Sequence, residues 1–140
     1  MPFRLAIFDE PTLSGDWWQI GKVLRMITEC EVLNVICGGT EKIPAHLQEF
    51  AVRGYILGVW PCLDDEESVI GNILAYHKVL AQDALYVGSA PSSIYRARKA
   101  KVATLCFGDT HHSPIKETQP DYFIHSLMDT LSIIRAQIPS

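Results

Sequence analysis

One acidic residue, Asp9, directly follows the first apolar run of the chain, Phe3–Phe8. A carboxylate at this place can attack an electrophile, offer oxygen to a divalent cation, or simply lead the chain into a turn. Glu10, Pro11 and Thr12 come next, and Pro11 prevents the run from continuing as a central strand. Two interpretations therefore stay open: a catalytic, metal-binding carboxylate, or the polar end of a strand.

Small residues follow two further apolar runs. Cys37 and Gly38 stand at the end of the second run, and Ser89 and Ser93 follow a glycine just before a predicted helix. Backbone N–H groups that precede a helix can bind an anion, although serines at such places are more often helix caps. The candidate substrate-binding residues are Thr12, Cys37, Gly38 and Ser89.

The histidines and cysteines give no metal signature. His111 and His112 are adjacent in a long loop, where a solvated pair is favoured over a ligand pair or a proton shuttle. The four cysteines form no CxxC pair, so we expect free thiols in a reducing cytoplasm and no zinc site. They are Cys30, Cys37, Cys62 and Cys106.

Strand-like and helix-like segments alternate along the chain. Strands are predicted at 3–8, 31–37, 55–60, 84–87, 101–107 and 122–124. Helices are predicted at 17–29, 44–52, 64–80, 91–99 and 127–136. Asp16 and Ser126 are the predicted caps of the first and last helix. The first helix should bury Trp17, Ile20 and Leu24.

This order predicts the fold class. Strands that alternate with helices favour right-handed βαβ units, and hence a parallel sheet with helices on both faces. We therefore predict a doubly wound, three-layer, Rossmann-like α/β domain that spans residues 1–140 as a single unit. Ligands of such sheets bind at the carboxyl ends of the strands, where the candidate residues Asp9, Cys37 and Ser89 would lie.

Three segments together resemble a known superfamily. The segment 84–104, which reads ALYVGSAPSSIYRARKAKVAT, is similar to the fourth motif region of the haloacid dehalogenase (HAD)-like hydrolases. Residues 7–13, IFDEPTL, resemble their first motif, and residues 120–127, PDYFIHSL, resemble their closing strand and helix. The resemblance covers almost the whole chain and implies a HAD-like domain without the larger cap domains.

The resemblance implies that Asp9 stands in the place of the nucleophile that forms an aspartyl-phosphate. The general acid two positions later is replaced by Pro11 or Thr12, and Glu10 should point to the opposite side of an extended strand. Cys37 takes the place of the phosphate-binding Thr or Ser of the second motif, for which Thr40 could substitute after a shift.

Two further groups of the family pattern are missing. The motif lysine or arginine would fall near Leu63 to Asp65, where the chain is acidic. Ser89 and Ser93 replace the carboxylates that hold Mg²⁺ after the fourth strand, which leaves Asp9 as the one family carboxylate for a metal. No cofactor is therefore expected, or Mg²⁺ if the chain is catalytic.

The residues described above are compatible with three functions to different degrees. The favoured hypothesis is a HAD-like domain that has lost phosphohydrolase activity and acts as a binding or regulatory protein. The alternative is an active Mg²⁺-dependent phosphatase that uses Asp9, supported by acids such as Glu10, Asp16, Asp64 or Asp109. A receiver-like signalling domain is disfavoured, because it needs an Asp after the third strand and a Lys after the fifth, where Pro61-Cys62 and Gly108-Asp109 stand.

The charge and hydrophobicity of the chain limit the classes of partner that we expect. The net charge is −4 and the 12 basic residues are scattered, so we expect no nucleic acid partner. The apolar runs are too short for a membrane span, and the first residues resemble a strand rather than a signal peptide, which favours a cytoplasmic location. The expected partner is a protein or a small anionic ligand. Trp17 and Trp18 cannot both face the core, so a homodimer through their helix is a further hypothesis.

Overall fold

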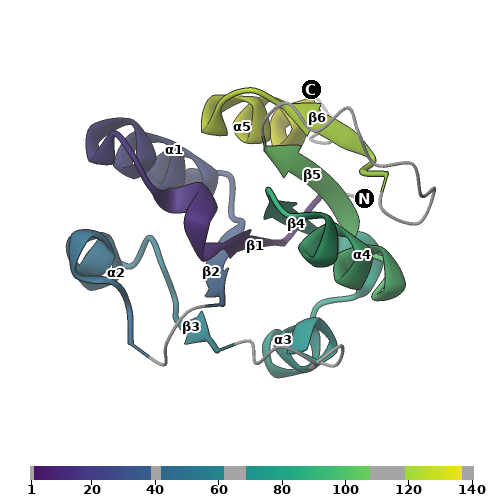
Figure 1. Ribbon diagram of the computed structural model, residues 1–140. Helices are drawn as coiled ribbons and strands as arrows, with labels where there is room; N and C mark the ends of the chain where they lie inside the picture. The colour runs from purple at the N-terminus through teal and green to yellow at the C-terminus, as the bar shows by residue number, and fades with distance from the viewer. Residues whose placement is uncertain (1, 39–41, 62–68, 108–118, 137–140) are drawn as a thin grey trace.

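The sheet of this protein has six parallel strands in the order β3-β2-β1-β4-β5-β6 (Figure 1). The computed structural model describes residues 2–38, 42–61, 69–107 and 119–136. The strands are β1 (Leu5–Asp9), β2 (Leu33–Cys37), β3 (Val59–Trp60), β4 (Ala84–Gly88), β5 (Ala103–Phe107) and β6 (Tyr122–Ile124). The central strand β1 pairs with β2 on one side and with β4 on the other, so its end lies between two neighbouring strand ends.

Helices cover both faces of the sheet, which confirms the predicted three-layer Rossmann-like architecture (Figure 1). They are α1 (Trp17–Glu29), α2 (Gln48–Val52), α3 (Val69–His77), α4 (Pro91–Lys99) and α5 (Leu127–Ala136). Residues of α1, α2 and α5 pack in one core with one face, and residues of α3 and α4 pack in a second core with the other. None of the helices described is both long and apolar enough to cross a membrane.

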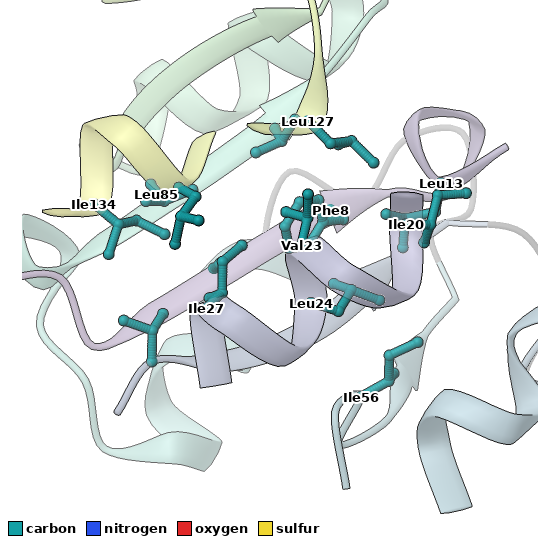
Figure 2. Packing of buried hydrophobic residues seen from close by; sticks show 14 of the residues in the cluster. Phe8, Leu13, Ile20, Val23, Leu24, Ile27, Ile56, Leu85, Leu127 and Ile134 are labelled. Carbon is teal, nitrogen blue, oxygen red and sulfur yellow. The ribbon is translucent and has the colours of Figure 1, made fainter. Parts of the chain in front are cut away.

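Side-chain alternation along β1 divides it between the two cores. Phe8 points toward α1 and packs in the same cluster as Val23, Ile27 and Leu127 (Figure 2). Ile7, its neighbour, belongs to the opposite cluster beneath α3 and α4. By the same alternation, the side chain of Asp9 emerges on the α3–α4 side of the sheet, where β1 ends.

Helix α1 begins where its cap signal predicts, because Oδ1 of Asp16 accepts a hydrogen bond from the Trp18 N–H at 3.0 Å. Ile20 and Leu24 are buried as predicted, but the prediction for Trp17 was wrong, because its side chain is 56% exposed. Trp17 shares their stripe of the helix but lies in the first turn, which the core does not cover. Asp129, in the first turn of α5, accepts from the Ser126 N–H at 3.1 Å.

Several predicted elements differ from the structure in length or type, and the helix predicted to reach residue 80 ends at His77. The assigned third strand is confined to Val59–Trp60, although the segment before it also bonds to β2. The Leu57 N–H donates to the Asn34 carbonyl at 2.9 Å, and the Ile36 N–H donates to the Gly58 carbonyl at 3.0 Å. At Tyr55, the side chain of Asn34 takes the carbonyl at 3.1 Å. Glu10 does not lie on an extended strand as predicted, since a 3₁₀ helix, Glu10–Leu13, begins at this residue. The helix predicted at 44–52 is a 3₁₀ turn followed by α2.

Candidate functional site

The candidate site lies where the sheet reverses its order. Connections from β1 lead through α1 to β2 on one side, whereas the neighbour on the other side, β4, is reached only after β3 and α3. Ligand sites of doubly wound sheets lie at this switch point, in the crevice beyond the carboxyl ends of the strands. Asp9 ends β1 there and Gly88 ends β4, so the two segments that resemble HAD motifs come together at this place.

Asp9 is held by a residue that lies 84 positions away in the sequence. The Ser93 hydroxyl, in the first turn of α4, donates to Oδ2 of Asp9 at 3.0 Å. The Thr12 hydroxyl donates to the backbone carbonyl of Asp9 at 2.6 Å and thereby fixes the turn that follows β1. Ser93 and Thr12 are buried and Asp9 is half-buried, so Ser93 positions the carboxylate and Thr12 positions the backbone of the same residue.

The electrostatic surroundings favour a protonated Asp9 more than water does. Burial raises its pKa above the ordinary value of 3.8, and the nearby charge of Glu10 adds to this effect. The hydrogen bond from Ser93, the positive charge of Arg96 and the backbone N–H of Glu10 act in the opposite direction without cancelling the effect of burial. The structure thus gives Asp9 one hydroxyl donor and one guanidinium of α4 as its main stabilising neighbours.

Gly38 leaves room beside the carboxylate. Its φ of 107° lies in the left-handed region, and a Cβ at this position would lie 3.2 Å from Oδ1 of Asp9. Its backbone N–H donates to the carbonyl of Trp60 at 2.8 Å. Gly38 therefore offers a ligand space next to Asp9 rather than a hydrogen-bond donor.

A buried tyrosine lies under the same site. Tyr86 of β4 is fully buried, and its hydroxyl makes no hydrogen bond within the part of the chain that the structure describes. Burial raises the pKa of Tyr86, and the charges of Cys37 and Asp9 raise it further. Ser93 lies close enough to act on the Tyr86 pKa, but its single proton goes to Asp9. Tyr86 is thus a neutral side chain that closes the floor of the site.

The structure brings some of the predicted site residues together and separates others. Cys37 pairs with Asp9 in the β1–β2 register. Gly38 lies beside Oδ1 of Asp9, and the Thr12 hydroxyl bonds to the Asp9 backbone carbonyl. Ser89 is half-buried after β4 and forms no bond to Asp9; Ser93 does so instead. Asp16 caps α1. Five candidates lie outside the described residues: Thr40, Asp64, Asp109, His111 and His112.

Sequence reasoning missed Arg96 and did not foresee the bond of Ser93. A signal for both exists, because residues three apart share one face of a helix and Ser93 and Arg96 are spaced in this way on α4. The face that carries Ser93 into the core therefore also directs Arg96 toward the ends of β1 and β4. What the sequence lacked was the distance between α4 and β1.

The donor set does not fit a magnesium ion. Mg²⁺ needs octahedral oxygen ligands, commonly with carboxylates, whereas this site offers Asp9, two hydroxyl groups already used in hydrogen bonds, and the soft thiol of Cys37. Within residues 2–38, 42–61, 69–107 and 119–136, no three His, Cys, Asp or Glu side chains gather closely enough to hold a metal ion. The residues described around Asp9 therefore do not match the ligands that a catalytic magnesium ion requires.

Comparison with known sequences gives a distant relative. No family model matches the chain. The phosphoglycolate phosphatase of Vibrio parahaemolyticus serotype O3:K6 is 25% identical over 99 residues, which cover 66% of this chain and 43% of that protein. The chain thus spans less than half the length of this curated relative.

Solved structures agree with the fold. The core domain of a Streptococcus pneumoniae TIGR4 protein described as a phosphoglycolate phosphatase matches with a TM-score of 0.70 and 16% identity over 98% of each chain. The cobalt-bound deoxy-D-mannose-octulosonate 8-phosphate phosphatase of Haemophilus influenzae matches with 0.71 and 12% identity, over 96% of this chain and 88% of that one. The chain therefore has the HAD-like α/β fold, and the resemblance seen in the sequence is confirmed at that level.

Proposed function

We propose that this chain is a HAD-like binding or regulatory domain that has lost phosphohydrolase activity. One observation carries the proposal: the carboxylate in the place of the nucleophile accepts a hydrogen bond from Ser93, which stands where the fourth motif would supply a metal-binding carboxylate. A hydroxyl donor that bonds directly to Asp9 neither holds Mg²⁺ nor compensates the charge of a transferring phosphoryl group.

The site has few of the groups that stabilise negative charge during phosphoryl transfer. Phosphoryl transfer depends mainly on groups that stabilise negative charge, and loss of one such donor can cost about 100-fold or more in rate. Near Asp9 the described residues supply Arg96 as a cation and Glu10 as a neighbouring acid, but no group of three metal-ligating side chains and no acid two positions beyond the nucleophile.

The test is hydrolysis of p-nitrophenyl phosphate with and without Mg²⁺, by the native chain and by Asp9→Asn. We expect no Mg²⁺-dependent turnover by the native chain above that of the variant. Turnover that requires Mg²⁺ and disappears in Asp9→Asn would overturn the proposal. That result would establish the alternative, an active phosphatase with rearranged supporting groups.

A second carboxylate should restore a metal response. In Ser93→Asp, two carboxylates would lie side by side, and we expect a melting temperature that rises with added Mg²⁺. At ten times the dissociation constant, binding would add about 1.4 kcal/mol of stability, or roughly 3–6 °C for a domain of this size. The native chain and Ser92→Asp, with its residue exposed on the same turn, should show no such rise. An equal rise in the native chain would contradict this prediction.

The raised pKa of Asp9 predicts a pH effect on stability. Between the ordinary value of 3.8 and the higher folded value, the native state binds more protons than the unfolded state, so stability falls as pH rises through this window. Asp9→Asn removes this loss and should be the more stable protein at pH 7. The advantage should shrink below pH 4, which urea unfolding at a series of pH values would measure. A stability advantage of Asp9→Asn that grows toward low pH would refute this prediction.

The ligand of this domain is proposed by class. One class is a small anion that would lie beside Arg96 at the strand ends, and the other is a protein partner. Both fit a site that has one cation and few catalytic groups. Self-association through α1 is a separate proposal, which the exposure of both Trp17 and Trp18 supports. Sedimentation of the native chain beside Trp18→Ala would test it, since only the native chain should form a dimer.

A further inference from the structure

A pocket that Asp9 does not line opens on the opposite face of the sheet from the Asp9 side chain. It opens between α1 and α2, which pack with the core that contains Phe8, whereas Ser93 belongs to α4 beneath the other face (Figure 1). We call it the α1–α2 pocket. Its volume is about 410 Å³, which is within the range of small-molecule sites.

Aromatic rings form much of its wall. Trp17, Trp18, Phe50 and Tyr55 line the pocket, and the two tryptophans are 56% and 69% exposed. Their rings meet edge to face with centroids 5.8 Å apart. Such exposure of two adjacent tryptophans is uncommon on a protein surface and is typical of a contact site.

A glycine shapes the floor of the pocket. A Cβ on Gly21 would lie 2.5 Å from Cε1 of Phe50, so the absence of a side chain on α1 lets the Phe50 ring lie against the helix. Phe50 is itself buried and cannot easily give way. The close approach of α1 and α2 thus places the tryptophans above an apolar base.

The rim carries an excess of positive charge. Lys22, Arg25 and Arg53 line the pocket together with one acid, Glu49, which gives a local charge of +2 on a chain whose net charge is −4. Arg53 pairs with Glu49 at 3.1 Å, and Arg25 lies 3.8 Å from Glu29. Among the residues described, Lys22 has no ion pair or hydrogen bond that would occupy its ammonium group.

We propose that the α1–α2 pocket binds a small aromatic anion, a planar ring that carries a carboxylate, phosphate or sulfonate. The ring would pack against the tryptophans over Phe50, and the anionic group would lie beside Lys22 and Arg25. Each part of the pocket selects one part of this ligand: aromatic walls favour a flat apolar ring, and a cationic rim attracts anions and repels cations. The proposal does not depend on whether Asp9 catalyses a reaction.

The test uses three probes that separate the need for an aromatic ring from the need for a negative charge. 2-Naphthoate has both a ring system and a negative charge, 2-naphthol at pH 7 lacks the charge, and cyclohexanecarboxylate lacks the aromatic ring. Titration calorimetry on the full chain should give an affinity for 2-naphthoate about tenfold or more above that for either of the others. Equal affinity for all three would overturn the proposal.

Matched variants locate the site. Trp18→Ala should weaken 2-naphthoate about tenfold and Lys22→Gln about threefold. The controls, Tyr76→Ala and Arg135→Gln, remove an exposed aromatic and an exposed cation from other helices and should leave the affinity unchanged. Circular dichroism of each variant verifies folding.

Three results would overturn the proposal and remain distinct from a failure of the proposed function. The first is unchanged affinity in both pocket variants. The second is a native dimer that dissociates in Trp18→Ala and excludes the probe, because the occupant would then be a second copy of the chain. The third is loss of 2-naphthoate binding in Asp9→Asn, which would place the probe at the strand ends instead.

Discussion

Replacement of Phe8 by alanine should lower the free energy of unfolding by about 3–5 kcal/mol. Phe8 is 1% exposed on the central strand β1, and it packs in the core beneath α1 and α5 (Figure 2). The change removes a large apolar surface and leaves a cavity that a sheet paired on both sides cannot close. Urea unfolding should show a lower midpoint with an unchanged slope.

A matched control comes from the outer strand β6. Phe123 is 45% exposed, so Phe123→Ala makes the same chemical change with about half the loss of buried surface and should cost about 1–2 kcal/mol. A cost for Phe8→Ala as small as that of the control would mean that the core beneath α1 is not packed as described.

The second large effect is expected for Asn34→Ala, at about 2–3 kcal/mol. Asn34 is 2% exposed, and its Nδ2 lies 3.2 Å from the carbonyl of Leu24 and 3.1 Å from that of Tyr55. It also lies 3.2 Å from the hydroxyl of Thr28. Alanine would remove the side-chain donor of the partly buried Tyr55 carbonyl and would open a void between β2 and α1.

The same change should loosen the α1–α2 pocket, because Asn34 ties α1 to the segment that carries Tyr55. Amide hydrogen exchange should therefore accelerate around residues 54–57 more than in α4. Asn72→Ala is the control, since Asn72 is exposed on α3 and alanine is the better helix former. Equal destabilisation by both variants would show that the Asn34 contacts contribute little.

Local signals predicted most of the fold. The strands β1 and β4 come from apolar runs because both of their faces are covered, and Asp16 marks the start of α1 through its cap. The failures lie where tertiary contacts override the pattern. Residues 55–60 have strand-like composition, but the Tyr55 carbonyl bonds to the side chain of Asn34 and the assigned strand begins only at Val59.

The candidate site could be located from the sequence but not assembled. The predicted parallel sheet placed Asp9 and the segment after Gly88 at the same end, because the carboxyl ends of parallel strands share one edge. Which serine meets Asp9 depends on the depth to which the first turn of α4 reaches, and only the structure supplies that distance. The unpaired Tyr86 hydroxyl left no trace in the sequence, because a tyrosine within a buried strand resembles any other apolar residue.

The lengths of the outer strands have a consequence for self-association. β3 has two residues and β6 has three, so neither border of the sheet offers a long row of free backbone groups to a strand of another molecule. Short borders of this kind discourage the edge-to-edge growth that leads to aggregates. Among the residues that the structure describes, recognition of a second copy would therefore rest on side chains rather than on strand edges, and a single substitution on a helix surface could abolish such a contact while the sheet stayed intact.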